Sequence, residues 1–215
     1  MIIKQVKTYD SIIFDLDGTL WNACEACARG WTTGLSTLNY NKTVSKKDIE
    51  NICGLTYDEI MDELFSDSSI DKETIKNALN KYERLEVEKS GGDLFDGVSF
   101  LIPQLRKQFD LYIVSNCQEW YLEVFLNHSG LKENFNDWES HGKTGLKKFE
   151  NINSVIKRNN LKKTIYIGDT PGDLEAAKKA DIDFLYAQYG FQEFNYTPFV
   201  HSFKELADYF LSTSI

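Results

Sequence analysis

Two aspartates in the motif Asp15-Leu16-Asp17-Gly18-Thr19 are the residues of this chain best suited to chemistry. They follow an apolar run at residues 12–14, which predicts a buried strand that ends at the motif. Ligand sites form beyond the carboxyl ends of strands in open parallel sheets, so both carboxylates should reach such a site. In a straight strand Asp15 and Asp17 would share one face, where like charges repel each other. A divalent cation is the simplest way to compensate that repulsion.

Two further predicted strands also end in polar residues. Residues 111–114 lead to Ser115 and Asn116, and residues 164–167 lead into the segment Gly168-Asp169-Thr170-Pro171-Gly172-Asp173. If the strands are parallel and adjacent, their carboxyl ends meet at one edge of the sheet. The sequence therefore predicts one site assembled from distant segments.

Strands that alternate with helices predict an α/β fold with a doubly wound parallel sheet. Hydrophobic periodicity predicts helices over 98–105, 119–127, 151–159 and 172–180, a strand over 184–187 and a closing helix after Ser202. Apolar residues in the segment 131–146 follow neither the helical nor the strand period, and we expect the segment to be irregular, with Phe135 and Trp138 as anchors.

Residues 21–90 differ from the rest, because β-branched runs give way to capped helical patterns. Helices are predicted over 22–38, after Ser45, after Thr56 and through 75–85, and Gly91-Gly92 ends this stretch. We therefore predict a core domain of residues 1–20 and 91–215, with a helical cap domain inserted at residues 21–90.

Composition limits the partners. The 215 residues include 24 Lys and Arg against 33 Asp and Glu, and the net charge of -9 argues against nucleic acid and for a small or metal-screened anion. No apolar run approaches the ~18 residues of a membrane span and no signal-peptide pattern is present, so we expect no membrane partner and a cytoplasmic location. Cys24, Cys27, Cys53 and Cys117 are expected to be packing residues rather than redox or metal-binding ones.

In order along the chain, the Asp-x-Asp-Gly-Thr motif, the strand ending in Ser-Asn, a lysine and the Gly-Asp-x-x-x-Asp motif resemble the haloacid dehalogenase-like superfamily. The helical segment after the first motif is similar to the caps of its phosphoglycolate phosphatase and β-phosphoglucomutase-like members. The resemblance covers nearly the whole chain and implies a Rossmann-like core. It implies a phosphatase in which Asp15 is the nucleophile that forms an aspartyl-phosphate, and Asp17 is the general acid and base.

The resemblance also implies a Mg²⁺ site and a phosphate site. Mg²⁺ would bind the Asp15 carboxylate, the Asp17 main-chain carbonyl and Asp169. Asp173 would support the metal through water or hydrogen bonds, although it also fits as a favourable charge in the first turn of a helix. The residues expected to bind the phosphoryl group are Gly18, Thr19, Ser115, Asn116 and Lys148. The family lysine directly precedes a helix, which favours Lys148 over Lys147, but the usual Lys-Pro pair is replaced by Lys148-Phe149.

The cap of such enzymes closes over the site and contacts the rest of the substrate. Candidate contacts near the hinge and in a turn between cap helices are Trp21, Asn22, Arg29 and Thr56. Arg29 could meet a second anionic group, whereas Trp21 and Trp31 are better explained as packing residues. The substrate stays open among small phosphorylated metabolites such as phosphoglycolate, a sugar phosphate or a nucleotide, and so does the oligomeric state.

Asp17 favours phosphoryl transfer over carbon–halogen cleavage, since dehalogenating members of the superfamily lack a carboxylate at this position. A sugar-phosphate mutase is the alternative within the superfamily, because Arg29-Gly30-Trp31 is similar to the Arg-Ala-Trp segment of the mutases. Mutases carry a histidine where this chain has Cys27, which favours hydrolysis. A non-catalytic module that binds a phosphometabolite is the other alternative, although binding alone does not require Asp17.

Overall fold

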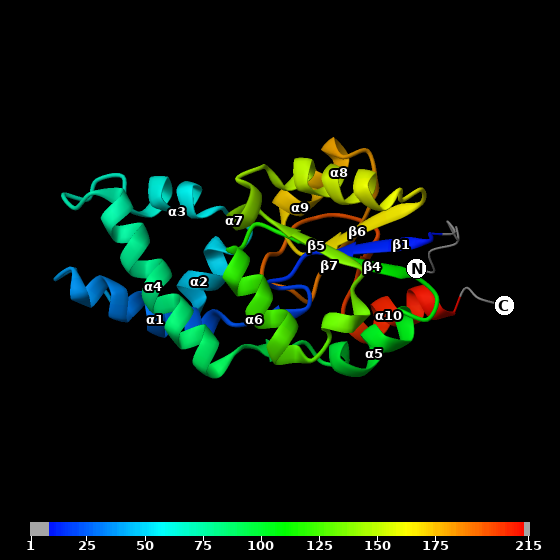
Figure 1. Cartoon of the computed structure of the whole chain (residues 1–215), viewed down its shortest axis with the longest axis horizontal. Helices are drawn as coiled ribbons and strands as arrows, with labels where there is room; N and C mark the ends of the chain where they lie inside the picture. The colour runs from blue at the N-terminus through cyan, green and yellow to red at the C-terminus, as the bar shows by residue number, and fades with distance from the viewer. Residues whose placement is uncertain (1–8, 213–215) are drawn as a thin grey trace.

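A six-stranded parallel sheet forms the centre of the molecule (Figure 1). The computed structural model describes residues 9–212, so residues 1–8 and 213–215 of the predicted core domain lie outside the description. The strand order is β5-β4-β1-β6-β7-β8, and neighbouring strands are parallel. The strands are β1 (Ser11–Phe14), β4 (Asp110–Ser115), β5 (Asp137–Ser140), β6 (Thr164–Gly168), β7 (Asp183–Ala187) and β8 (Phe199–Val200). This order places β1 between β4 and β6, the two strands predicted to end in polar residues.

The two faces of the sheet bury alternate residues of each strand. Ile12 and Phe14 pack on one face and Ile13 on the other, as the two-residue period of a strand requires. The first face is covered by α5 (Val98–Leu105), α6 (Glu119–Ser129) and α10 (Phe203–Leu211), and the second by α8 (Lys148–Asn159) and α9 (Pro171–Lys179). Helices on both faces of a parallel sheet are a doubly wound α/β fold, so the predicted fold class is confirmed.

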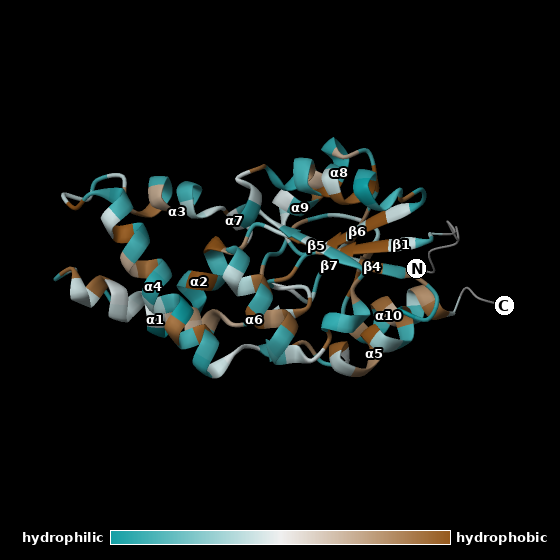
Figure 2. Cartoon of the chain, viewed as in Figure 1, coloured by the Kyte–Doolittle hydropathy of each residue, from teal (hydrophilic) through white to brown (hydrophobic). Residues whose placement is uncertain are grey.

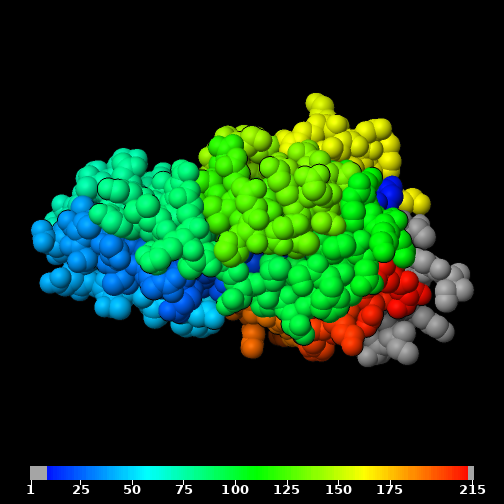
Figure 3. Space-filling view, turned by 60° about the horizontal axis from the view of Figure 1, so that its bottom comes forward, coloured from blue at the N-terminus to red at the C-terminus, as the bar shows by residue number. Residues whose placement is uncertain are grey.

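Four of the helices, named here the cap helices, lie together at one end of an elongated molecule (Figures 1 and 3). They are α1 (Cys24–Thr37), α2 (Lys46–Ile52), α3 (Tyr57–Leu64) and α4 (Lys72–Ser90). Ser45 and Thr56 each form the capping box that starts the helix after them. The chain enters and leaves the cap helices through an antiparallel pair, β2 (Trp21–Asn22) and β3 (Asp93–Leu94).

The expectation of an irregular segment over residues 131–146 is wrong. The segment contains a 3₁₀ turn (Lys132–Asn134), the strand β5 and the short helix α7 (His141–Thr144). β5 forms the edge of the sheet beside β4. Its sequence, Asp-Trp-Glu-Ser, lacks the apolar alternation of most strands, because Asp137 and Glu139 form ion pairs with Arg158 of α8. Ion pairs with Arg158, which is distant in sequence, thus stabilise this strand in place of alternating apolar side chains.

Apolar residues are concentrated in the sheet and on the helix sides that face it (Figure 2). In α8, Ile152 and Val155 are fully buried, whereas Asn153 and Lys157 are exposed. No helix in residues 9–212 has both the length and the apolar character needed to cross a bilayer. The apolar stripes of the core helices are used for packing on the sheet.

The contact between α1 and α4 yields a test of cap packing. A Cβ atom on Gly30 would lie 2.5 Å from Glu83 Cα and 2.6 Å from the Tyr82 carbonyl oxygen. Gly30→Ala should lower the free energy of unfolding by about 1–2 kcal/mol, because overpacking costs more than the ~1 kcal/mol of helix propensity that alanine adds. Urea unfolding measures the change. In the control Gly172→Ala, the new Cβ would meet only Thr170 Oγ1 at 3.5 Å, so no loss is expected. If Gly30→Ala and Gly172→Ala were equally stable, the close contact of α1 with α4 at Gly30 would be contradicted.

Candidate active site

The carboxyl edge of the sheet brings together side chains that follow three neighbouring strands. Asp15 follows β1, Ser115 ends β4 and Asp169 follows β6. Their alignment results from the register, because the end of β1 pairs in parallel with both β4 and β6. All three side chains are buried. The three predicted strand ends therefore form one enclosed site.

Lys148 is the cation at the centre of this site. Its ammonium nitrogen lies 2.9 Å from Asp15 Oδ1 and 2.6 Å from Asp173 Oδ1, and all three residues are buried. Burial disfavours a charged lysine, but the two carboxylates outweigh burial and raise the pKa of Lys148. Lys147 is exposed and occupies the N-cap position of α8. Of the two candidate lysines, Lys148 is the one that lies in the carboxylate cluster.

Asp173 both caps α9 and contacts Lys148. Its Oδ2 accepts hydrogen bonds from the backbone N–H of Asp169 at 3.2 Å, the backbone N–H of Thr170 at 3.0 Å and the Thr170 hydroxyl at 2.8 Å. Its Oδ1 accepts from Lys148. The capping box thus fixes the orientation of a carboxylate that also belongs to the site.

Asp169 is held by a loop, residues 188–192, that no sequence motif indicated. The backbone N–H of Phe191 donates to Asp169 Oδ2 at 2.7 Å. Gly190 packs against Asp169 so closely that a side chain at this position would overlap with it. The Tyr189 hydroxyl donates to the Thr19 carbonyl at 2.8 Å and connects the loop to the first motif. Residues 188–192 carry no charged side chain, which is why sequence reasoning missed them.

Gly18 and Thr19 pack against the same carboxylate. Gly18 has a φ of +78°, and a Cβ atom on it would overlap with the Asp169 carboxylate. Thr19 is buried, and its hydroxyl lies 3.5 Å from Asp169 Oδ1. The structure therefore gives both residues a role in shaping the site, and their contact with phosphate stays a prediction.

Asp15 and Asp17 have different partners although they belong to one motif. Asp15 pairs with Lys148, whereas Asp17 Oδ1 accepts a hydrogen bond from the Tyr121 hydroxyl at 2.5 Å. Burial raises the pKa of Asp17 to about 7, and the bond from Tyr121 opposes that rise. Burial also raises the pKa of Asp15 to about 6, with Asp173 adding to the rise and Lys148 opposing it. A carboxyl with a pKa near neutrality can both give and take a proton.

Three carboxylates of the site could hold a divalent cation together. One oxygen each from Asp15, Asp169 and Asp173 lies within 4.8 Å of the others. Burial, followed by the nearby Asp173 and Asp15, raises the pKa of Asp169 well above its usual range. Lys148 supplies one positive charge against three carboxylates, so a hard cation with oxygen ligands would lower the cost of the cluster. The donor set and its charge fit the predicted Mg²⁺.

A cavity of about 80 Å³ lies between the core and the cap helices. The core contributes Asp15, Asp17, Ser115, Asn116, Cys117, Gln118, Trp120 and Tyr121, and the cap side contributes Cys27, Trp31, Ile49, Ile52, Cys53, Gly54, Leu55, Tyr57, Ile60 and Glu83. The Asn116 side chain donates to the Gly54 carbonyl at 2.8 Å, and Gln192 donates to the Cys53 carbonyl at 3.1 Å. These bonds hold the cap helices over both aspartates.

None of the predicted cap contacts is among the described residues that line this cavity. Trp21 is fully buried and packs edge-on against Tyr121 and Phe125, so it belongs to the core. Arg29 lies on the exposed side of α1, where its Nε donates to Glu86 at 2.9 Å. Arg29 therefore does not line the cavity, and its contact with a second anionic group stays a prediction.

Asn22 and Thr56 serve the backbone of the cap helices instead. Asn22 accepts a hydrogen bond from the backbone N–H of Cys24, and Thr56 is the N-cap residue of α3. Trp31, which we expected to be only a packing residue, lines the cavity together with Glu83. Glu83 was missed because helical spacing alone does not show which face of α4 meets the site.

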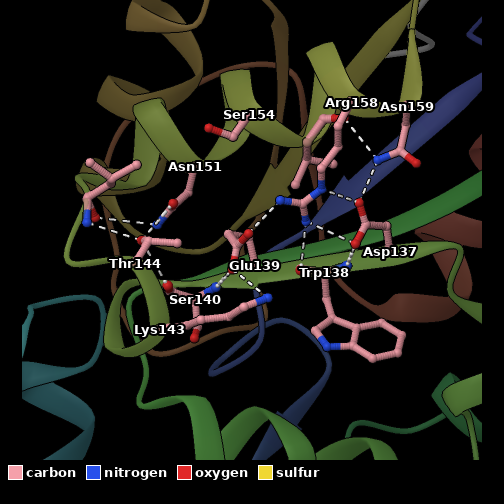
Figure 4. Close-up of polar contacts among 12 residues, drawn as sticks. Asp137, Trp138, Glu139, Ser140, Lys143, Thr144, Asn151, Ser154, Arg158 and Asn159 are labelled. Carbon is pink, nitrogen blue, oxygen red and sulfur yellow. Dashed lines mark hydrogen bonds and ion pairs between the residues drawn. The ribbon is translucent and has the colours of Figure 1, made fainter.

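Ion pairs with β5 position α8, the helix that begins with Lys148 (Figure 4). The Arg158 guanidinium contacts both carboxylate oxygens of Asp137 and also Glu139, whose side chain is 5% exposed. At the other end of the helix, Asn151 accepts a hydrogen bond from Thr144 at 2.9 Å. Because β5 pairs with β4, these contacts fix α8 relative to the sheet.

The fold and the site define an α/β protein with an acidic centre at the carboxyl edge of a parallel sheet, closed by cap helices. The model of the haloacid dehalogenase-like hydrolase family matches residues 12–187. The chain therefore belongs to the haloacid dehalogenase-like hydrolases, as its motifs predicted, and is an enzyme. No curated protein matches it significantly in sequence.

Solved structures share the whole architecture. A predicted phosphatase from Clostridium acetobutylicum has a TM-score of 0.81 at 22% identity, over 96% of this chain and 100% of that one. A haloacid dehalogenase-like hydrolase from Streptococcus pneumoniae has a TM-score of 0.79 at 22% identity, over 94% and 98%. CbbY from Rhodobacter sphaeroides, in complex with phosphate, has a TM-score of 0.77 at 17% identity, over 93% and 96%. At these identities the likeness establishes the fold.

Arg158→Ala tests how α8 is held. The substitution removes the guanidinium from the buried Glu139, which keeps Lys143 at 3.4 Å and the backbone N–H of Ser140 at 3.3 Å, so the free energy of unfolding should fall by about 1–3 kcal/mol. Urea unfolding measures this loss. Lys157→Ala, on the exposed side of the same helix, should change stability by less than about 0.5 kcal/mol. If Arg158→Ala behaved like this control, the ion pairs would not fix the helix.

Proposed function

We propose that the protein is a Mg²⁺-dependent cytoplasmic phosphatase that hydrolyses a small phosphomonoester through an aspartyl-phosphate intermediate. The observation that carries this proposal is the unequal environment of two buried carboxylates that line one cavity. Asp15 is bound by Lys148, and Asp17 is bound by Tyr121 and has a pKa of about 7. Nucleophilic attack and proton transfer need two carboxyl groups that differ in this way.

In the first step an oxygen of Asp15 attacks phosphorus, and the bond from phosphorus to the ester oxygen breaks. Asp17 gives its proton to that departing oxygen, so an alcohol leaves and Asp17 becomes a carboxylate. In the second step Asp17 takes a proton from water, and the resulting hydroxide attacks the aspartyl-phosphate. Phosphate leaves and Asp15 is restored.

The other residues of the site hold the phosphoryl group and screen its charge. Lys148 provides a fixed positive charge, and Ser115 offers its hydroxyl from the end of β4. The proposed phosphoryl site also includes Gly18, Thr19 and Asn116. A bound Mg²⁺, held by Asp15, the Asp17 carbonyl and Asp169 with support from Asp173, would supply Lewis-acid stabilisation.

Asp15→Asn tests the nucleophile. Release of p-nitrophenol from p-nitrophenyl phosphate should require Mg²⁺, stop in EDTA, and be absent in Asp15→Asn, because an amide does not form the acyl phosphate. Asp208→Asn, an exposed change on α10, should keep wild-type activity.

Three results would overturn the proposal. Full activity of Asp15→Asn would exclude the nucleophile. No turnover by the wild type on a broad phosphometabolite panel would favour a binding module. Faster interconversion of hexose phosphates than phosphate release would favour a mutase.

Asp17→Asn tests proton transfer separately. The nitrophenolate ion leaves without protonation, so the variant should form the aspartyl-phosphate in a burst and then hydrolyse it slowly. Steady-state kcat should fall by about 10²–10⁴. Rapid-mixing absorbance detects the burst, and acid-quenched phosphate labelling detects the covalent intermediate. Loss of the burst along with turnover would show that Asp17 acts before phosphoryl transfer rather than after it.

A further inference from the structure

The cap side of the cavity contains one carboxylate whose position is fixed by backbone packing. Glu83 lies on α4, is 8% exposed and lines the same cavity as Asp15 and Asp17. The α1 backbone at Gly30 passes directly beside Glu83 Cα, which leaves no room for a side chain between the helices. Glu83 is therefore held at the cavity by a close backbone contact between α1 and α4.

Glu83 has a hydrogen-bond donor but no cation beside it. The Tyr57 hydroxyl, which also lines the cavity, donates to its carboxylate. None of the ion pairs found in residues 9–212 includes Glu83. Burial raises the pKa of Glu83 above its ordinary value, as expected for a carboxyl without a cationic partner. A cation entering the cavity would remove this cost.

The rest of the cavity also suits a cation on a short carbon chain. Aromatic side chains, which attract cations at their faces, line it at Trp31, Tyr57 and Trp120. Ile49 and Ile60 add apolar surface. Among the described residues that line the cavity there is no Lys, Arg or His. A second anionic group on a substrate would therefore lie beside the Glu83 carboxylate without a cationic partner.

We propose that the substrate is the phosphomonoester of an amino alcohol, whose ammonium group is bound by Glu83 with Trp31 and Tyr57. This proposal rests on the phosphatase function proposed above and names its substrate class. The phosphoryl group meets Asp15 and the ammonium group meets Glu83, which both line the same cavity. Carboxylated phosphoesters such as phosphoglycolate should be poor substrates.

Steady-state kinetics on three matched series test the substrate class. The first series is O-phosphoethanolamine with its propyl and butyl homologues, the second replaces the ammonium group by a methyl group, and the third by a carboxylate. The best ammonium substrate should exceed its methyl counterpart in kcat/KM by at least about tenfold, the effect of one charge-assisted hydrogen bond. The carboxylate series should be the slowest.

Glu83→Gln assigns the preference to this residue. The variant should raise KM for the ammonium series by at least about tenfold and leave both constants for the methyl series unchanged. A purely structural role would change both series alike. Glu88→Gln makes the same chemical change at an exposed position of the same helix and should keep the wild-type preference.

A measurement on the wild type keeps the test decisive if Glu83→Gln does not fold. Alkylammonium ions should inhibit hydrolysis of p-nitrophenyl phosphate more strongly than the matching alcohols, and alkyl carboxylates should not inhibit it. Equal inhibition by all three classes, or no preference among the three substrate series, would overturn the inference while leaving the phosphatase intact. Absence of Asp15-dependent hydrolysis of p-nitrophenyl phosphate would instead overturn the proposed function.

Discussion

The ion pairs of Lys148 with Asp15 and Asp173 are the interaction on which the rest of the site depends. They join the end of β1, the start of α8 and the first turn of α9 in one buried cluster. A buried charge that loses its partner is costly, so each of these elements must be placed accurately for the others to be stable. The register of β1 with its neighbours, the capping box at Thr170 and the Arg158 ion pairs all serve this placement.

A second constraint is the closure of the cap helices over the aspartates. The cavity is walled mainly by apolar and aromatic residues, and hydrogen bonds from Asn116 and Gln192 to cap carbonyls hold the cap helices beside it. Exclusion of water strengthens electrostatic interactions inside such a site and raises the pKa of Asp17. The same packing leaves Glu83 buried in the wall of the cavity. Proton transfer and substrate choice thus depend on one packing arrangement.

Local sequence patterns predicted much of this structure because the signals lie close together along the chain. The strand at residues 11–14 and the capping boxes at Ser45 and Thr56 need only adjacent residues, and all three are present. The strand β5 was missed because its stability comes from Arg158, about twenty residues later. The family resemblance favoured Lys148 over the adjacent Lys147, and the first turn of α8 directs Lys148 into the carboxylate cluster.

The sequence by itself determined the family, the order of the motifs and the aspartate pair, because these depend on residue types at fixed short spacings. Only the tertiary structure decided which side chains reach the cavity. Trp21 and Trp31 both lie near the hinge in sequence, yet the first packs in the core and the second lines the cavity. Glu83 reaches the site because α1 and α4 pack together at Gly30. The physical reason is that a helix buries the face chosen by its packing partner, and that partner is distant in sequence.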